Sequence, residues 1–391
     1  MKKLPVKIAI LTGNRAEYGL LYPLIKELLN EDLFEVYLIV TGTHLSHKHG
    51  YTIEQIKDDN IPISYKVDIL CDEDSEYGIC KTISTGIEKI SDIFNNNEFD
   101  LLIVLGDRYE LLAACICAIN YKVPIAHIHG GEITKGAIDD MIRHVITKMA
   151  SIHFPSIEVY GKRIIQMGEH PSRVHVVGAL GIDNIKSIAL MSKEELSREI
   201  GINFDKDVAL ITYHPVTSDQ YIEASQQVKE VLEAVLRTNL IGLITMPNSD
   251  CGGQAIFNTI SKYINRYPQR LKMVKSLGTR KYLSAMKHAK MMIGNSSSGI
   301  IESASFCLPV INIGDRQEGR YKCANVIDCN CSKEDILFSI QKALAIEFID
   351  SISQLKNPYG DGNTAKHIVQ VLKTIDFSNK KALLKKGFCD L

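Results

Sequence analysis

Apolar runs rich in β-branched residues alternate with amphipathic segments along the first third of the chain. In the amphipathic segments the apolar residues recur every three or four positions, which predicts helices. The expected strands are Val6–Leu11, Phe34–Val40, Leu101–Leu105 and Pro124–Ile128. The expected helices are Tyr18–Leu29, Tyr51–Asp58, Ile79–Asn95 and Leu111–Asn120. This alternation indicates a parallel sheet with helices on both faces.

The alternation continues through the rest of the chain. Further strands are expected at Ile152–Phe154, Val174–Val177, Val208–Thr212, Leu240–Met246, Leu271–Val274, Met291–Ile293, Val310–Ile313 and Val326–Ile327. Further helices are expected at Ile142–Ala150, Met191–Gly201, Gln220–Thr238 and Ala365–Ile375. Because Gly178–Gly181 has the character of a hinge, we predict one α/β lobe at residues 1–178 and another at 179–364. Residues 365–391 are expected to hold the last helix and a loosely held, Lys-rich tail.

Polar residues gather where the expected strands of the first lobe end. They are Asn14 and Arg15, His44, Asp107 and Arg108, and the segment His129–Glu132. Ligands of open α/β sheets bind beyond the carboxyl ends of the strands. Four polar clusters at equivalent positions therefore predict one shared site. We expect this site in the cleft between the two lobes.

The stretch Gly294–Glu302 predicts a phosphate-binding corner. An apolar run precedes it, and Ile300–Phe306 has helical spacing with no helix breaker. Backbone N–H groups at a helix start, together with the hydroxyls of the serines at 296 to 298, suit a phosphate group. Glu302, one turn into the helix, is expected to bind a pair of hydroxyls such as those of a ribose. The alternative is a capped helix after a tight turn.

Composition narrows the class of protein. The chain has 391 residues, 45% hydrophobic and 23% charged, which is typical of a globular protein with two or three domains. Its net charge of −1 argues against a nucleic-acid binder. The chain has no apolar run of membrane-spanning length, and its first residues continue into Thr12–Arg15 without a cleavage site. We therefore expect a cytoplasmic protein with no membrane partner.

The cysteines and histidines do not predict a metal site. Ten cysteines are scattered without a CxxC pair, and Cys329–Cys331 has the wrong spacing for a zinc knuckle. Reduced, buried thiols are expected instead. The run His44–His49 is dense in histidine, and we prefer a solvated loop to a metal site there.

Several motifs together resemble one family. They are the run Thr12–Gly19, Gly106–Arg108, His129–Glu132, Gly294–Glu302 and Asp315–Arg320. The combination is similar to that of the hydrolysing UDP-N-acetylglucosamine 2-epimerases, the sialic-acid-pathway branch of the UDP-HexNAc 2-epimerases, from Ile8 to about Thr374. The resemblance implies two Rossmann-like lobes in a glycosyltransferase-B-like fold, with the final helix packed back on the first lobe. It also implies conversion of UDP-GlcNAc and water to UDP and N-acetylmannosamine, with no metal or other cofactor. It further implies a homodimer or homotetramer.

The resemblance also implies roles for individual residues. The acid/base carboxylates would be Asp107, Glu132 and Asp139, with His214 at the leaving group. The UDP-binding residues would be Arg15, Arg108, Asn248, Ser296, Ser297, Glu302 and Arg316, with His214 beside them. Candidate sugar-site residues are His44, His129, Asp140 and Arg143.

Some of these positions leave alternatives open. His129 stands where non-hydrolysing relatives carry a Glu, so Glu132 is expected to take over that role only in part. Either Asp139 or Asp140 could face the sugar. Both could also be ordinary acidic residues of a first helical turn, with Arg143 on the helix surface. His127, within an apolar strand, is expected to be a core residue. The segment with Tyr282 is either close to the uracil or an ordinary amphipathic helix.

The chemistry that the resemblance implies fits this residue set. Inverting C2 requires breaking a weakly acidic C–H bond, which elimination of UDP to a 2-acetamidoglucal makes accessible. Water then adds with the opposite configuration. Carboxylates crowded at one site raise one another's pKa, which suits proton transfer. Arginines and a helix start would hold the departing diphosphate.

Other functions remain open from the sequence. The same reaction on UDP-N,N′-diacetylbacillosamine, in a legionaminic-acid type of pathway, is one alternative. A non-hydrolysing epimerase would return a UDP-sugar with its diphosphate bond intact. A glycosyltransferase of the same fold would need an acceptor, and a nucleotide-sugar sensor would bind without turnover.

Overall fold

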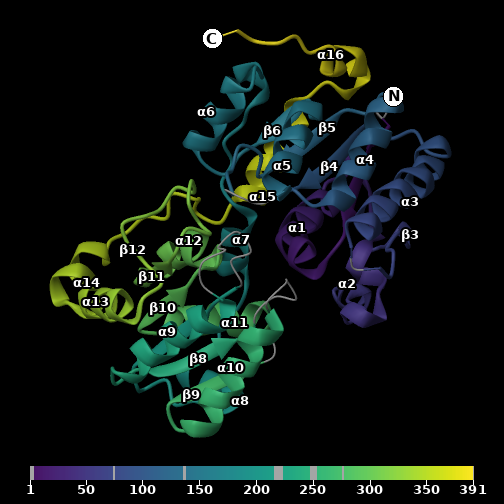
Figure 1. Cartoon of the computed structure of the whole chain (residues 1–391). Helices are drawn as coiled ribbons and strands as arrows, with labels where there is room; N and C mark the ends of the chain where they lie inside the picture. Colours follow the sequence, from purple (N-terminus) through teal and green to yellow (C-terminus); the bar gives the residue numbers. More distant parts are fainter. Residues whose placement is uncertain are drawn as a thin grey trace. The chain divides into compact units, whose positions relative to one another are not determined.

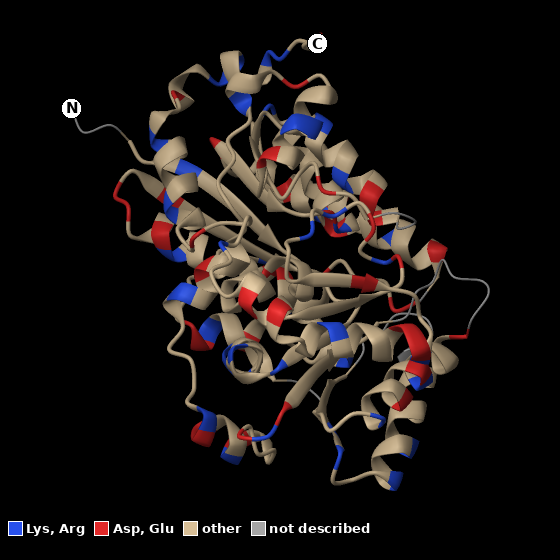
Figure 2. Ribbon diagram, turned by 90° about the vertical axis from the view of Figure 1, so that its left-hand side faces the viewer, with Lys and Arg blue, Asp and Glu red and all other residues tan. Residues whose placement is uncertain are grey.

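The computed structural model describes residues 4–73, 75–134, 138–214, 223–246, 253–274 and 277–390. The chain divides into two compact units, which are described separately. The first unit comprises Met1–Glu132, Ala137–Asn184 and Gly360–Leu391, and the second comprises Ile133–Gly136 and Ile185–Tyr359. Apart from residues 133–136, the chain passes from the first unit to the second at residues 184 and 185, inside the helix Leu180–Ser187, and returns at 359 and 360, whereas the sequence suggested 178 and 364. Acidic and basic residues are interspersed along the ribbon of both units (Figure 2).

The first unit contains a six-stranded parallel sheet flanked by helices (Figure 1). Its strands are β1 (Val6–Thr12), β2 (Phe34–Thr41), β3 (Tyr65–Val67), β4 (Leu101–Leu105), β5 (Ile125–Ile128) and β6 (Ile152–Phe154). Its helices are α1 (Arg15–Leu29), α2 (Ile53–Asp58), α3 (Glu76–Asn95), α4 (Tyr109–Asn120), α5 (Ile138–Met149), α6 (Glu158–Gln166), α7 (Leu180–Ser187), α15 (Thr364–Thr374) and α16 (Lys380–Leu384). The strand order is β3-β2-β1-β4-β5-β6, so the direction of winding reverses between β1 and β4. Open sheets of this type bind ligands at that reversal.

Both faces of this sheet are buried, because alternate residues of each strand point to opposite faces. Ile8 and Ile10 of β1 belong to the core that also includes residues of α1 and α15. Ala9 and Leu11 belong to the core that includes residues of α3, α4 and α5. The strands therefore read as continuous apolar runs, which is why the sequence pattern located them.

The second unit repeats the same topology. Its strands are β7 (Val208–Thr212), β8 (Ile241–Thr245), β9 (Leu271–Val274), β10 (Met291–Gly294), β11 (Val310–Ile313) and β12 (Val326–Cys329). Its helices are α8 (Lys193–Ile200), α9 (Ala224–Leu236), α10 (Gly253–Arg266), α11 (Gly278–His288), α12 (Ser298–Ile301), α13 (Lys333–Leu344) and α14 (Ile346–Ile352). The parallel order β12-β11-β10-β7-β8-β9 reverses between β7 and β10. The equivalent ligand position is therefore at the ends of β7 and β10.

The C-terminal segment belongs to the first unit. Helix α15 packs against α1, and Thr364 and Ala365 donate their backbone N–H groups to Asp183 at 2.9 and 2.7 Å. The tail beyond α16 is held in place, contrary to the expectation of a loose tail. Lys386 Nζ lies 2.8 Å from Glu169 Oε1 and also donates to the Ala150 carbonyl at 2.7 Å.

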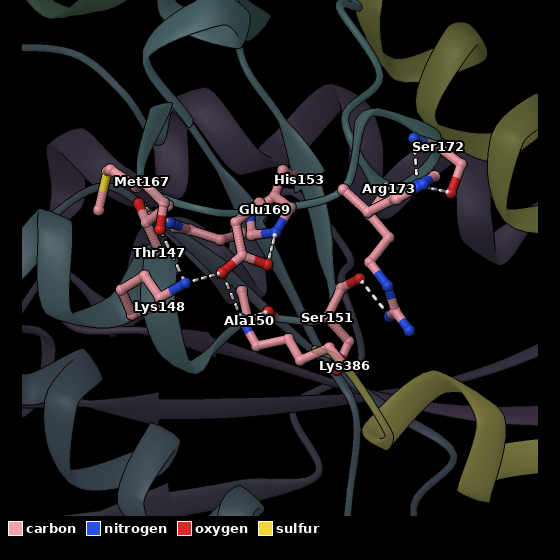
Figure 3. A network of polar contacts seen from close by, with 12 residues as sticks. Thr147, Lys148, Ala150, Ser151, His153, Met167, Glu169, Ser172, Arg173 and Lys386 are labelled. Carbon is pink, nitrogen blue, oxygen red and sulfur yellow. Dashed lines mark hydrogen bonds and ion pairs between the residues drawn. The ribbon is translucent and has the colours of Figure 1, made fainter. Parts of the chain in front are cut away.

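Glu169 is the centre of the network that holds this tail (Figure 3). It is 1% exposed and accepts hydrogen bonds from Lys148 of α5, His153 of β6 and Lys386. Burial lowers the pKa of His153, so this ring is neutral and donates its Nε2–H. Burial alone would raise the pKa of Glu169, but the three donors outweigh it and lower the pKa to about 2.

The expected strand Val174–Val177 does not form a regular ladder of backbone hydrogen bonds. Between Val174 and Val177 the described backbone forms a single bridge, from Val174 to His153, and Val177 donates its N–H to the Pro155 carbonyl. Pro155 has no N–H to donate, so regular pairing stops where β6 ends. The segment Gly178–Gly181, expected as a hinge, includes the start of α7.

Candidate functional site

The turn after β1 is built around a buried carboxyl group. Asn14 caps α1 by accepting a hydrogen bond from the Glu17 backbone N–H at 3.0 Å, which is a standard N-cap contact. The Glu17 side chain reaches back to the Gly13 backbone N–H at 2.6 Å and is 5% exposed. Burial raises the pKa of Glu17 to about 8, so this carboxyl is largely protonated at neutral pH. Arg15, a predicted UDP-binding residue, lies on the exposed side of the first turn.

The turn after β4 holds Asp107 and Arg108. Gly106 adopts φ +84°, which favours glycine, and its carbonyl contacts the His127 ring at 2.7 Å. Arg108 forms a two-pronged ion pair with Glu110, from Nε at 3.3 Å and Nη2 at 3.1 Å. Burial lowers the pKa of Arg108, but the fully buried Glu110 carboxylate outweighs this and raises it. Glu110, which the sequence did not single out, thereby fixes the guanidinium.

Arg143 of α5 brings several candidate residues together. It is 3% exposed and donates to the Asp107 carboxylate, to Asp140 Oδ1 at 3.0 Å and to the Glu132 carbonyl at 3.0 Å. The alternative that placed Arg143 on a helix surface is therefore wrong.

The adjacent acidic residue differs from Asp140. Burial and then the charge of Asp107 raise the pKa of Asp139, while the two nearby arginines lower it. A carboxyl group with a raised pKa is suited to donate a proton near neutral pH. Asp140, in contrast, is paired with Arg143.

The motif His129–Glu132 forms a tight turn at the end of β5. His129 adopts φ +65° and Gly131 φ +77°, which folds Glu132 back on His129. His129 Nδ1 lies 2.8 Å from Glu132 Oε1, and Ser156 also donates to this oxygen at 3.4 Å. Both residues are buried, at 8% and 3% exposure.

Two further histidines are buried near these turns. His44 is fully buried between Thr12 Oγ1 at 3.1 Å and Thr52 Oγ1 at 2.8 Å, and burial lowers its pKa to about 4. The expectation of a solvated loop is therefore wrong for His44, although His47 and His49 are exposed. His127 is fully buried with both ring nitrogens in contact with oxygens, as expected for a core residue.

In the second unit, the ends of β7 and β10 are joined by a reciprocal pair of hydrogen bonds. The Asn295 side chain accepts from the His214 backbone N–H at 2.8 Å and donates to the His214 carbonyl at 2.9 Å. Burial and the charge of Arg316 lower the pKa of His214 to about 4. His214 therefore presents a neutral imidazole at the strand reversal. Asn295, which the sequence did not single out, thus joins the ends of the two strands.

Arg316 and Gln317 hold the same turn from the other side. Both donate to the Asn295 carbonyl, at 3.0 and 2.9 Å. Arg316 thus lies beside His214 and the serine turn. Asn248, another predicted UDP-binding residue, lies outside the described residues.

The turn expected to bind phosphate is present, but the helix that follows it is shorter than expected. Gly294 adopts φ +144°, and a Cβ there would lie 1.9 Å from the Thr212 carbonyl oxygen, so only glycine fits. The following α12 ends at Ile301 and tightens into a 3₁₀ turn at Ser303–Phe306. Cys307, in the left-handed region at φ +48°, ends the segment. Glu302 therefore lies at the junction of two short helices, and the prediction of one longer helix is wrong.

Hydroxyl groups form a chain in this corner. Ser296 Oγ lies 3.0 Å from Ser298 Oγ, which lies 2.5 Å from the Tyr282 hydroxyl of α11. Burial raises the pKa of Tyr282. The structure thus brings Tyr282 to the serines, which are 14 to 16 residues away in sequence. Neither of the two expectations for Tyr282, a position close to the uracil or an ordinary amphipathic helix, included this contact.

The described residues contain neither a metal-binding cluster nor a membrane-spanning helix. No group of three or more His, Cys, Asp or Glu residues is arranged to hold a metal ion within the described ranges. No helix in the part of the chain that the structure describes has the length and apolar character to cross a bilayer.

Comparisons with known proteins agree with one another. A family model described as UDP-N-acetylglucosamine 2-epimerase matches residues 26–373. A Campylobacter jejuni protein named GDP/UDP-N,N′-diacetylbacillosamine 2-epimerase (hydrolyzing) is 38% identical over 98% of this chain and 99% of its own length. A Legionella pneumophila protein named UDP-N,N′-diacetylbacillosamine 2-epimerase (hydrolyzing) is 36% identical over 94% of this chain and 96% of its own.

The fold is also found among solved structures. The crystal structure of UDP-GlcNAc 2-epimerase from Neisseria meningitidis bound to UDP-GlcNAc matches with a TM-score of 0.81 at 18% identity, over 95% of this chain and 100% of that one. This match confirms the predicted α/β fold of two Rossmann-like lobes, of the glycosyltransferase-B type. Because the family model spans most of the chain and two relatives exceed 30% identity over nearly its whole length, the chain belongs to the UDP-N-acetylglucosamine 2-epimerase family.

Proposed function

We propose that this protein is a hydrolysing UDP-sugar 2-epimerase whose substrate is UDP-N,N′-diacetylbacillosamine. It would release UDP and the free sugar with C2 inverted. The observation that carries the choice of sugar is the pair of relatives at 38% and 36% identity, both named for diacetylbacillosamine and for hydrolysis. The sequence analysis gave this sugar as an alternative substrate, and the names of these two relatives favour it over the substrate of the sialic-acid branch.

The second unit is proposed to hold the diphosphate. The Ser296 and Ser297 hydroxyls and the positive charge of Arg316 are suited to phosphate oxygens, as is the start of the serine turn. His214, neutral and fixed by Asn295, would donate a hydrogen bond to the leaving oxygen. Glu302 would bind ribose hydroxyls, and Arg15, Arg108 and Asn248 remain proposed UDP ligands.

The first unit is proposed to handle the protons. Asp107 and Glu132 contact the same Arg143 guanidinium, so the turns after β4 and β5 are held together. Asp139, with its raised pKa, would donate a proton, and the other carboxylates, Asp107 and Glu132, would accept one. His44, His129, Asp140 and Arg143 would line or support the sugar site. The proposal requires both clusters to act on one substrate molecule.

Elimination followed by hydration accounts for the products. A base takes the C2 proton, the C2–H electron pair forms the C1=C2 double bond, and UDP leaves with the C1–O pair. Water then adds its oxygen to C1, and an acid adds a proton to the opposite face of C2. Each positioned acid or base is worth about 10²–10⁴-fold in rate.

UDP-GlcNAc is the second candidate substrate, favoured by the description of the family itself. Its product would be N-acetylmannosamine, the main expectation from the sequence. The two sugars differ at C4 and C6. A homo-oligomeric state, which the resemblance implies, and a cytoplasmic location, expected from the sequence, remain proposals.

Parallel incubation with the two UDP-sugars tests the proposal. UDP release would be followed with a coupled assay, and the sugar products identified by NMR. We expect a higher kcat/KM for UDP-N,N′-diacetylbacillosamine, with inverted free sugar as product. A higher kcat/KM for UDP-GlcNAc would select the second candidate, and release of UDP from neither sugar would refute both.

A further inference from the structure

His129 has an unusual backbone and an unusual ring environment. Its φ of +65° is rare for a residue with a side chain, and such strain concentrates at functional sites. Its Nδ1 forms a hydrogen bond with Glu132, whereas its buried Nε2 has no hydrogen-bond partner among the described residues. A buried polar atom without a partner is uncommon and calls for a functional explanation.

The surrounding turn holds this ring rigidly. The His129 backbone N–H donates to the Phe154 carbonyl at 3.1 Å, and Arg163 donates to the Gly131 carbonyl at 2.6 Å. A Cβ at Gly131 would lie 2.4 Å from the Tyr160 carbonyl oxygen, so a residue with a side chain would displace the turn. The sequence of the turn therefore specifies the contact between positions 129 and 132.

The carboxylate determines which ring nitrogen carries the proton. Glu132 Oε1 is an acceptor, so Nδ1 must carry the hydrogen of a neutral ring, and Nε2 carries the lone pair. The same oxygen also accepts from Ser156. A buried acidic partner of this kind orients an imidazole and stabilises its protonated form, as in other His–carboxylate pairs.

We propose that His129 is the base that removes the C2 proton of the sugar, and that Glu132 is a positioning residue that acts through it. This inference rests on the proposed function and reassigns the role first given to Glu132. His129 lies in the cluster that holds Asp107, because Arg143 bonds both the Glu132 carbonyl and the Asp107 carboxylate.

The elimination transfers one proton and moves two electron pairs. The C2–H bond breaks, the proton forms a bond with the Nε2 lone pair, and the C2–H electrons become the C1=C2 π bond. The C1–O bond breaks and its electrons leave with UDP. His129 becomes an imidazolium next to the Glu132 carboxylate and later releases its proton to water. Asp139 is the group proposed to protonate C2 from the other face.

Variants at both positions separate this scheme from one in which Glu132 is the base. Asparagine tolerates the left-handed backbone at 129, so His129→Asn removes the imidazole with least effect on the turn. We expect kcat to fall about 10²–10⁴-fold and the Kd for UDP to change less than about twofold. His129→Gln should behave alike, and the exposed His170→Gln should match the wild type.

Glu132→Gln should keep measurable activity and shift the pH profile. The titratable or charged groups around His129 are Glu132, His127 and Arg143. Removing the Glu132 charge disfavours the imidazolium, so the acidic limb of kcat/KM should move to lower pH. Near-wild-type turnover of His129→Asn would overturn the assignment. Loss of the acidic limb in Glu132→Gln would also overturn it, because Glu132 would then be the base.

A measurement on the unsubstituted protein does not depend on folding of the variants. In ¹⁵N-histidine NMR, the ring of His129 should show a protonated Nδ1 and an unprotonated Nε2. A protonated Nε2 in the neutral ring would refute the proposal. Failure of the wild type to release UDP or invert C2 would instead refute the proposed function, which keeps the two failures distinct.

Discussion

Replacement of Glu169 by Gln tests how far one buried carboxylate stabilises the first unit. Glu169 is 1% exposed and accepts from Lys148, His153 and Lys386, which come from α5, β6 and the C-terminal tail. Its pKa is about 2 in the folded protein against 4.5 for an unperturbed glutamate. At about 1.4 kcal/mol per pKa unit, this difference corresponds to roughly 3 kcal/mol of stability at neutral pH.

The sign of the pH dependence follows from the lowered pKa. The contribution is complete above about pH 4.5 and is lost as pH falls through about 2. Urea unfolding of wild type and Glu169→Gln should therefore differ by roughly 3 kcal/mol at pH 7 and by less than half of that at pH 3. Glu158→Gln, an exposed position on α6, is the matched control and should change little. A loss below about 1 kcal/mol at pH 7, or one that does not shrink in acid, would refute the reasoning.

Three further predictions concern candidate site residues of the second and first units. Tyr282→Phe removes the hydroxyl that contacts Ser298 and should weaken UDP binding about five- to tenfold, as measured by calorimetry. The control Tyr263→Phe, which removes a hydroxyl bonded to Glu233, should leave UDP binding unchanged. Equal UDP affinities of the two variants would show that the Tyr282 hydroxyl does not contribute to UDP binding. Asn295→Ala breaks both bonds to the His214 backbone and should lower the free energy of unfolding by about 2 kcal/mol in urea, and an unchanged midpoint would contradict this. Asp107→Asn should bind UDP normally and lose about 10²–10⁴-fold in kcat, while an unchanged kcat would remove Asp107 from the mechanism.

The sheets could be predicted from sequence because their strands are buried on both faces. Runs such as Leu101–Leu105 contain no polar residue, and the structure has a strand at the same residues. The short edge strand β3 was missed, because a strand of three residues, only one of them buried, is too short to give a periodic signal. Helix α13 was missed although Ser332 caps its N-terminus by accepting from the Asp335 N–H, a signal that could have located it.

The arrangement of the candidate site was predictable only in part. Residues at strand ends, such as Asp107 and His214, follow from the rule for parallel sheets. Contacts between distant segments do not: Asn295 and His214 are 81 positions apart, and nothing local to either indicates the reciprocal hydrogen bonds. Glu17 and Glu110 were overlooked because acidic residues in a first helical turn usually face solvent, whereas here both are buried.

Turnover of the UDP-sugar in deuterium oxide tests the central claim most directly. If a base removes the C2 proton as UDP departs, mass spectrometry and NMR should find free UDP and a sugar with inverted C2 carrying one deuterium at that carbon. Full retention of the original hydrogen at C2, or a product still attached to the diphosphate, would contradict the account.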